Sequence, residues 1–341
     1  MEKIQEIIIY CFSGTGNSRQ IAGWFSRLAL DKVIPCRISD IAKTGSGIPE
    51  KTGAGTLIMI ISPIHGFNYP KITLDFIRRF PAGKNRVILM NTRAGLKAGK
   101  IVTPGLTGIA FIVSSLLLKK KGYKIAGQIA FDMPSNWISI HPALKDKSVG
   151  FILEKNHARV KKHFEELYMT GSNFSARKDI IQDILISPVS LAYYMIGRFF
   201  LGKSYYASDK CTNCNLCIKQ CPVQAIRKVD GRPYWTFKCE SCMRCMNNCP
   251  ENAIETTHGL WVILIYITSI ICTYLFYDLL PGSFQYRIVK FLLFNILLIG
   301  LLWIGYRIQQ FALKNRVMAR LISFTSLTHY SFWGRYRCRK S

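Results

Sequence analysis

Residues 6–18 read EIIIYCFSGTGNS and set an apolar run, a glycine-rich turn and the start of a helix in direct succession. An unbroken apolar run of this length is typical of a strand that is covered on both faces, as in parallel sheets. The residues that follow carry apolar side chains at the spacing of one helix face: Ile21, Trp24, Phe25 and Leu28. A strand that leads through a tight turn into a helix is the opening unit of an α/β fold.

The same alternation of strand and helix patterns continues to about residue 165. Four more segments have the composition of strands: residues 31–39, 55–62, 86–91 and 123–131. Segments with helical spacing lie between or after them: residues 73–80, 107–122 and 149–167. Five strands separated by helices predict a doubly wound, parallel α/β sheet over residues 1–165.

Residues that can hold a phosphate group follow the first strand. They are Ser13, Gly14, Thr15, Gly16, Asn17 and Ser18. Backbone N–H groups at a helix N-terminus, together with hydroxyl groups, bind phosphate. A Walker loop is excluded because no lysine follows, and the dinucleotide fingerprint fails because Arg19 stands at its third glycine position. The step from Cys11 to Arg19 is too long for a phosphatase loop.

This loop resembles the FMN phosphate loop of flavodoxins, which implies a flavodoxin-like fold and bound FMN. The resemblance places the flavin-ring contacts in the loops near residues 62 and 91, because ligands of such sheets lie beyond the carboxyl ends of the strands. The residues that it implicates are Pro63, Ile64, His65, Gly66 and Phe67 in the first loop, with Tyr69 also available, and Asn91, Thr92, Arg93 and Gly95 in the second.

Two of these residues are candidates for tuning a flavin, and the sequence assigns no catalytic residue beyond them. His65 can transfer a proton, although an isolated histidine in a loop is more often packed or solvated. Arg93, together with Lys97, would stabilise negative charge on a reduced flavin.

The most specific motif is C-x2-C-x2-C-x3-C-P, which occurs at residues 211–222 and again at 239–250. This is the spacing of bacterial ferredoxins with two 4Fe–4S clusters, in which the fourth cysteine of each motif ligates the other cluster. The first cysteine set is therefore Cys211, Cys214, Cys217 and Cys249. The second cysteine set is Cys239, Cys242, Cys245 and Cys221. Zinc would leave the last cysteine of each motif and both prolines unexplained, and a disulfide framework belongs to short secreted chains.

Two apolar segments follow the cysteines, at residues 259–280 and 288–306, and each is close to the ~20 residues that cross a bilayer. They predict a transmembrane hairpin, with two buried helices of a globular core as the alternative. No histidine or methionine occurs between Gly259 and Tyr306, so no haem is expected there. We expect the hairpin to be an anchor whose removal leaves the cofactors in place; a docking surface or one wall of a quinone pocket are the other roles considered.

Charge is distributed unevenly along the chain. Lys and Arg number 46 against 19 Asp and Glu, the formal net charge is +27, and no acidic residue follows Asp278. A basic excess beside apolar segments favours an anionic membrane surface over nucleic acid, for which the sequence carries no motif. The positive-inside rule then predicts that the basic tail, residues 307–341, and everything before residue 259 lie on the cytoplasmic side of the cytoplasmic membrane. The N-terminus lacks the pattern of a signal peptide.

Residues 166–205 link the sheet domain to the predicted α+β ferredoxin domain, residues 206–256. The linker is strongly apolar and is interrupted by Pro188. Two interpretations stay open: a helix packed on a neighbouring domain, or an interfacial helix that rests on the bilayer.

The order of the two redox modules resembles a family of flavodoxin–ferredoxin fusion proteins over about residues 5–256. The match is carried by YCFSGTGNS, by the two cysteine motifs and, more weakly, by MPSNW at residues 133–137. It implies electron transfer between FMN and two 4Fe–4S clusters, linking low-potential cytosolic donors to a partner or a membrane acceptor. Ferredoxin-, hydrogenase- or reductase-like proteins, or a quinone, are the expected partners. The alternative is an anchored ferredoxin-type subunit or assembly factor with a degenerate flavin site.

Overall fold

The computed structural model describes residues 4–43, 52–53, 55–276 and 284–336. The chain divides into two compact units, each with its own sheet structure and core. Unit 1 consists of residues 1–137, 143–191 and 336–341, and unit 2 consists of residues 138–142 and 192–335.

Unit 1 is built on a parallel sheet. Its main strands are β1 (Glu6–Cys11), β2 (Cys36–Asp40), β3 (Thr56–Pro63), β4 (Arg86–Ala98) and β6 (Lys124–Pro134). Their order across the sheet is β2-β1-β3-β4-β6, and every one of these pairings is parallel. This is the flavodoxin-type order, with the reversal of winding between β1 and β3. The predicted doubly wound, flavodoxin-like sheet is therefore confirmed.

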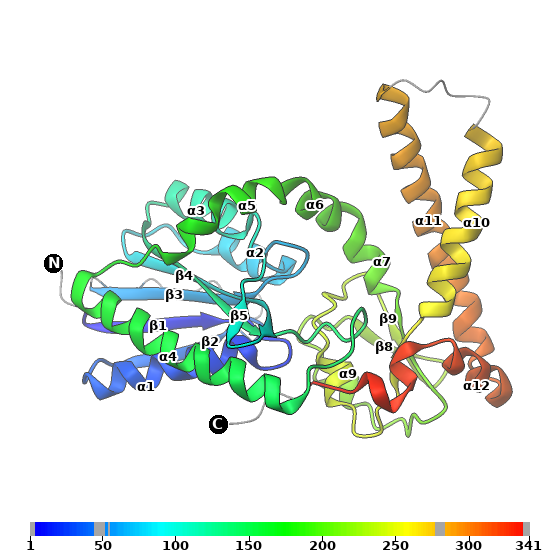
Figure 1. Ribbon diagram of the computed structural model, residues 1–341, viewed down its shortest axis with the longest axis horizontal. Coiled ribbons are helices and arrows are strands. Elements are labelled where there is room, and N and C mark those ends of the chain that lie inside the picture. Colours follow the sequence, from blue (N-terminus) through cyan, green and yellow to red (C-terminus); the bar gives the residue numbers. More distant parts are fainter. Residues whose placement is uncertain (1–3, 44–51, 54, 277–283, 337–341) are drawn as a thin grey trace. The chain divides into compact units, whose positions relative to one another are not determined.

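Four helices cover the two faces of this sheet: α1 (Asn17–Asp31), α2 (Lys71–Arg79), α3 (Ala110–Lys120) and α4 (Asp146–Thr170). Figure 1 shows α1 and α4 on one face and α2 and α3 on the other. Successive side chains of a strand point to opposite faces. Ile7 and Ile9 of β1 therefore join the core that α1 and α4 cover, whereas the ring of Tyr10 packs against Phe76 of α2.

Strand β4 is longer than the sequence indicated. A loop was expected after residue 91, but β4 continues to Ala98 and turns back into β5 (Ile101–Thr103). The extension forms because β6 runs beside β4 as far as the pair Gly95 and Pro134. A Cβ atom at Gly95 would lie 2.5 Å from the carbonyl oxygen of Asp132, so this close approach requires glycine.

The predicted linker begins inside α4 and is helical over most of its length. It contains the 3-10 helix η1 (Ser175–Asp179), α5 (Ile180–Leu185), α6 (Ser187–Ala192), a π-helical turn (Tyr193–Gly197) and α7 (Arg198–Gly202). Its first part is tied to the sheet, because the backbone of Asn173 exchanges hydrogen bonds with Ala126 and Gln128 of β6.

Unit 2 holds the cysteine motifs in a small α+β arrangement. Its elements are β7 (Tyr205–Ala207), α8 (Leu216–Lys219), β8 (Ile226–Val229), β9 (Arg232–Trp235), α9 (Arg244–Asn248) and β10 (Ile254–Thr256). Strand β7 pairs antiparallel with β10, and β8 pairs antiparallel with β9. Asp230 and Gly231 connect β8 to β9 with positive φ angles of 48° and 76°, as a type I′ turn requires.

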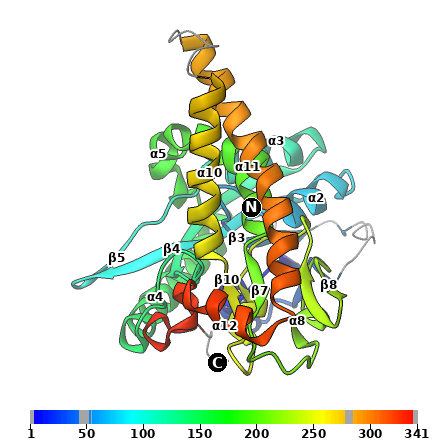
Figure 2. The ribbon, with the colours of Figure 1, turned by 90° about the vertical axis from the view of Figure 1, so that its right-hand side faces the viewer.

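Two long apolar helices follow, α10 (His258–Phe276) and α11 (Phe284–Ala312). Figure 2 shows them side by side, and Leu264, Leu298 and Leu302 pack together between them. Both helices are long and apolar enough to cross a membrane. The turn predicted between them, and residues 277–280 of the first predicted span, lie outside the described residues.

The segment after α11 is not the separable tail that the sequence suggested. It contains α12 (Arg316–Phe324) and the 3-10 helices Leu327–His329 and Ser331–Trp333. Leu313 and Ala319 pack against Tyr206 of β7, and the hydroxyl of Thr328 accepts a hydrogen bond from the backbone N–H of Thr256. Residues after α11 therefore form part of the core of unit 2, and we expect removal of residues 257–341 to open that core.

Tyr306 of α11 connects the hairpin to the small strands. The side chain is fully buried. Its hydroxyl accepts a hydrogen bond from the Trp235 N–H at 3.2 Å and donates one to the Tyr205 carbonyl oxygen at 2.8 Å.

We predict that Tyr306→Phe lowers the melting temperature of the detergent-solubilised chain, measured by tryptophan fluorescence. Each buried backbone group left without a partner costs about 1–3 kcal/mol. Tyr274→Phe is the matched control, because Tyr274 of α10 is 83% exposed. Equal melting temperatures for the two variants would contradict a structural role for the Tyr306 hydroxyl.

Candidate functional site

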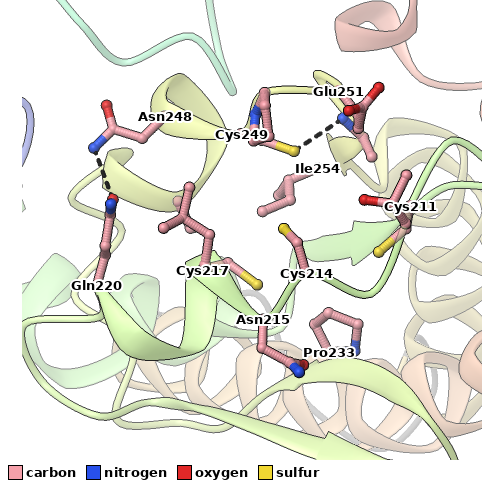
Figure 3. A pocket seen from close by; sticks show the side chains of 15 residues that line it. Cys211, Cys214, Asn215, Cys217, Gln220, Pro233, Asn248, Cys249, Glu251 and Ile254 are labelled. Carbon is pink, nitrogen blue, oxygen red and sulfur yellow. Dashed lines mark hydrogen bonds between the residues drawn. The ribbon is translucent and has the colours of Figure 1, made fainter.

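The first cysteine set surrounds one pocket of unit 2. Cys211, Cys214 and Cys217 reach it from the loop before and within α8, and Cys249 reaches it from the end of α9. Figure 3 shows the four sulfur atoms turned toward one shared space. The structure thus brings the last cysteine of the second motif to the first three of the other motif.

The second cysteine set lines a separate pocket, together with Tyr205 and Trp235. Cys221 joins Cys239, Cys242 and Cys245 there, and Cys245 also reaches the first pocket. Within the described parts of the chain, no three His, Cys, Asp or Glu side chains converge closely enough to hold one metal ion. In a 4Fe–4S cube each thiolate binds a different iron, so the four sulfur atoms stand around a space, as they do in both pockets.

The backbone of the two cysteine motifs repeats the same unusual conformations. Six residues with positive φ occupy three equivalent pairs of positions: Asn213 and Ser241, Asn215 and Met243, and Gln224 and Asn252. Positive φ is unfavourable for side chains such as those of Met and Gln, and such strain concentrates at functional sites. The strained turns aim backbone N–H groups at sulfur: Ala225 donates to Cys221 at 3.2 Å, and Ala253 donates to Cys249 at 3.3 Å.

Burial raises the pKa of Cys217 in the first set and of Cys239, Cys242 and Cys245 in the second set. The pKa of Cys217 is raised to about 11 by burial and by the charges of Cys211, Cys249 and Cys214. The pKa of Cys245 is raised well above its ordinary value by burial and by Cys239, Cys242 and Cys221. Thiols held in this way become metal ligands when a bound metal displaces their protons.

A buried lysine lies beside the second cysteine set. Lys203 is 2% exposed, and its ammonium group donates hydrogen bonds to the Tyr234 hydroxyl at 2.9 Å and the Trp235 carbonyl at 2.6 Å. The rings of Tyr234, Phe237 and Tyr306 surround it at 4.1–4.9 Å. Burial lowers the pKa of Lys203 to about 8, which still leaves the side chain charged at pH 7. The aromatic rings therefore stabilise the buried charge of Lys203 through cation–π contacts. Nothing in the sequence indicated this site.

In unit 1 the predicted phosphate loop connects β1 to α1. Gly16 has a φ of 114°, and its N–H donates to the Ser13 hydroxyl at 3.1 Å. Gly16 is the N-cap residue of α1 and has no side chain to cap the first turn of the helix. Ser18 exchanges a hydrogen bond of 2.8 Å with the hydroxyl of Thr92 on β4. A phosphate group fits this uncapped end of the helix.

Two contacts to the phosphate loop were not predicted. Asn136, which lies in the MPSNW stretch after β6, donates a hydrogen bond to the hydroxyl of Thr15. Tyr336, near the end of the described chain, donates its hydroxyl hydrogen to the side-chain oxygen of Asn17. The amide nitrogen of Asn17 in turn donates to the Pro134 carbonyl at 2.9 Å. The side chains of the loop are thus held by protein groups, and nothing in the basic tail distinguishes Tyr336 in the sequence.

The predicted first ring loop forms a tight turn at the carboxyl end of β3. His65 and Asn68 exchange backbone hydrogen bonds, and Gly66 and Phe67 between them have φ angles of 53° and 63°. The Phe67 carbonyl is fixed by the Ile109 N–H and the Ser190 hydroxyl. Pro63 ends β3 and Ile64 donates to the Thr92 carbonyl, so this loop lies directly beside β4.

Tyr69 does not belong to that site. Its side chain is 1% exposed, its hydroxyl donates to the Met90 carbonyl at 2.8 Å, and its ring packs against Phe111. The side chain enters the core, which corrects its inclusion among the candidates. By contrast, the Asn91 Oδ1 and Trp137 Nε1 atoms are buried and find no hydrogen-bond partner among the described residues. These two polar atoms near the carboxyl ends of the strands are what a bound polar ring can satisfy.

The charge of Arg93 is not available to a flavin as predicted. The side chain is 2% exposed and pairs with Asp132 at 2.6 Å and with Asp179 at 2.7 Å. Burial acts to lower the pKa of Arg93, but the two carboxylates raise it above its ordinary value. The ammonium group of Lys97, which is exposed, lies 4.8 Å from the centre of the Phe151 ring. Arg93 is therefore a structural ion-pair centre in unit 1.

Comparison with known protein families agrees with the geometry of the cysteine loops. Residues 210–254 match the family described as a 4Fe-4S dicluster domain. All eight cysteines of the two sets lie within this match. The chain therefore contains an iron–sulfur domain of the ferredoxin type. No curated protein matches the chain.

Among solved structures, flavodoxin 1 from Bacillus cereus matches 46% of this chain and 98% of its own, with 13% identity and a TM-score of 0.31. A short-chain flavodoxin associated with a bacterial microcompartment matches 47% of this chain and 97% of its own, with 12% identity and a TM-score of 0.26. Rubredoxin oxygen:oxidoreductase from Desulfovibrio gigas matches 49% of this chain, with 8% identity and a TM-score of 0.31, and the chain spans only 37% of that protein. At these scores the flavodoxin-like assignment rests on the strand order alone.

We predict that Arg93→Ala lowers the free energy of unfolding of unit 1 by about 3–5 kcal/mol, because it breaks a buried ion pair with Asp179 and leaves the Asp132 carboxylate with Arg159 as its remaining cation. Urea denaturation followed by circular dichroism measures the change. Arg78→Ala is the control, since the exposed pair of Arg78 with Asp75 contributes about 0–1 kcal/mol. An Arg93→Ala variant as stable as the control would overturn this assignment.

Proposed function

We propose that the chain is a membrane-anchored electron-transfer protein that binds two 4Fe–4S clusters and FMN. The single observation that carries the proposal is the grouping of the eight cysteines around two pockets, where the last cysteine of each motif joins the first three of the other motif. The first cysteine set would hold one cluster and the second set the other. When bound, each cluster accepts or gives one electron, and FMN one or two.

The residues of unit 1 supply the proposed FMN site. The N–H groups at the start of α1 and the hydroxyls of Ser13, Thr15 and Ser18 would hold the phosphate group. The turn at His65–Asn68 and the buried polar atoms of Asn91 and Trp137 would contact the ring. Placing both kinds of cofactor on one chain makes electron exchange between them intramolecular.

The two apolar helices support a membrane location for this protein. In the proposed arrangement both units face the cytoplasm, the basic residues after α11 meet the anionic lipid surface, and α10 and α11 span the cytoplasmic membrane. The proposed partners are ferredoxin-, hydrogenase- or reductase-like proteins, or a membrane quinone. Low-potential cytosolic donors would supply the electrons.

One observation favours a second candidate, an anchored ferredoxin-type subunit or assembly factor with a degenerate flavin site. Side chains of the phosphate loop already have protein partners in Asn136 and Tyr336. Strand β4 also continues through the segment expected to form the second ring loop. Flavin content separates the two candidates.

Anaerobic purification with analysis of iron, sulfide and flavin tests the proposal. We expect about eight iron and eight sulfide ions per chain, because two cubes carry four of each, together with extractable FMN. Cys249→Ala should lower the iron content by about half, whereas Cys272→Ala in α10 should leave it unchanged. Iron–sulfur absorbance without flavin, even after FMN is added back, would favour the second candidate. An unaltered iron content in Cys249→Ala would contradict the ligand assignment.

We predict that Lys203→Met lowers the midpoint potential of the cluster in the second cysteine set, on the order of tens of millivolts. The reduced cluster carries one more negative charge, and a buried cation nearby stabilises that state. Potentiometric titration followed by electron paramagnetic resonance measures the shift. Lys203→Arg should keep the wild-type potential, and Lys219→Met, at an exposed and therefore screened position, should change little. Equal shifts of the midpoint potential in Lys203→Met and Lys219→Met would contradict the prediction that the buried charge of Lys203 sets the potential of this cluster.

A further inference from the structure

The segment from Ile180 to Leu191 in unit 1 turns apolar side chains outward. Every exposed residue of α5 and α6 is apolar or proline: Ile180, Ile181, Ile184, Leu185, Pro188, Val189 and Leu191. Ile181 is 72% exposed and Leu185 is 75% exposed. We call these seven residues the apolar ridge.

The two buried polar side chains of the same segment, Asp183 and Ser190, bond to other parts of unit 1. The Asp183 carboxylate accepts hydrogen bonds from the backbone N–H groups of Thr107, at 3.3 Å, and Gly108, at 2.8 Å. The Ser190 hydroxyl donates to the Phe67 carbonyl at 2.9 Å. Just before the segment, Asp179 pairs with Arg93. These bonds fix the orientation of the segment, so the apolar ridge cannot turn inward without leaving buried polar groups unpaired.

Helix α4 of the same unit shows the opposite and ordinary arrangement. Its buried side includes Val149, Ile152, Val160, Phe164 and Leu167. Charged residues such as Lys161, Lys162 and Glu165 occupy its exposed side. A helix in contact with water normally has this distribution. The inverted distribution at α5 and α6 therefore indicates a surface that is covered by apolar material.

We propose that the apolar ridge rests in the interfacial layer of a lipid bilayer, so that unit 1 has a membrane contact of its own. The chain already carries two helices that can cross a membrane, so a bilayer is the apolar phase at hand. Arg177 and Lys178 are exposed directly before the ridge, as basic residues are at an anionic lipid surface. Within residues 175–195 the acidic residues are Asp179 and Asp183, and both are engaged on the inner side.

A shallow contact fits better than a span. The helical stretches Ser175–Leu185 and Ser187–Gly202 are bent by 73° at the break between them, so they do not form one straight span. The twelve residues from Ile180 to Leu191 extend only about 18 Å, whereas the hydrocarbon core is about 30 Å thick. The inner face of the segment is also bound to unit 1 through Asp183 and Ser190 and cannot be surrounded by lipid. This inference rests on the membrane anchoring in the proposed function, and the experiment below separates failure of one from failure of the other.

The test uses the full chain in vesicles of phosphatidylcholine and phosphatidylglycerol, at a low ratio of protein to lipid. A keto-bearing amino acid replaces Leu185, and a nitroxide attached to it leaves the cysteines untouched. Paramagnetic resonance compares collisions with oxygen, which enters lipid, and with a water-soluble nickel chelate. We expect an oxygen-to-nickel ratio several-fold higher at position 185 than at Met169 of α4, which is 66% exposed. Position 181 provides a second measurement should the first replacement disturb folding.

A ratio at positions 185 and 181 equal to that at Met169 would overturn the inference. Protection from both reagents, with dipolar broadening between labels, would overturn it too, because it would show a second copy of this chain on the ridge. A third label at Val262 of α10, which is 69% exposed, reports on the anchor. If Val262 is in lipid and position 185 is not, the anchor stands and the inference fails. If neither is in lipid, the membrane part of the proposed function fails as well.

Discussion

The buried guanidinium group of Arg93 connects three segments that lie far apart in the sequence. Its own strand is β4, Asp132 belongs to β6, and Asp179 ends the 3-10 helix before α5. A buried cation of this kind requires its carboxylates in place, since a single unpaired charge is expensive in the interior. The ion-pair centre therefore fixes the extension of β4 beside β6 and the point from which α5 departs. The direction in which the apolar ridge faces follows from that point.

In unit 2 the corresponding constraint is the exchange of one cysteine between the motifs. Neither motif can complete its pocket alone, because Cys221 and Cys249 each serve the other set. The paired left-handed residues make this exchange possible by turning the chain sharply around each set. Tyr306 and the segment after α11 then cover the strands beneath. The helices that would enter the membrane are thus joined by hydrogen bonds and packing to the part of unit 2 that would hold the clusters.

The sequence predicted the elements of both units that depend on local pattern. The parallel strands, the four sheet-covering helices and the presence of two long apolar helices agree with the structure because they arise from hydrophobic periodicity and glycine turns. The sequence could not show that β4 continues past residue 91, since that depends on a neighbouring strand and on the lack of a Cβ at Gly95. The sequence-based prediction assigned Arg93 to a flavin because its ion pairs are also long-range. The two carboxylates that pair with Arg93 lie 39 and 86 positions away in the sequence, and no sequence pattern marks them. Tyr336 reaches Asn17 across an even longer separation.

An amphipathic pattern in the sequence does not show which face of the helix lies against the protein. The spacing of Ile180, Ile184 and Leu185 defines an apolar face, and by analogy with α4 that face should lie against the sheet. The structure has the opposite orientation, because the Asp183 carboxylate accepts hydrogen bonds from the N–H groups of Thr107 and Gly108. These hydrogen bonds stabilise this orientation more than burial of the isoleucine side chains would stabilise the other one. A single buried carboxylate can thus determine which face of a helix lies against the protein. The apolar side chains are then left where only a non-aqueous phase would make their exposure favourable.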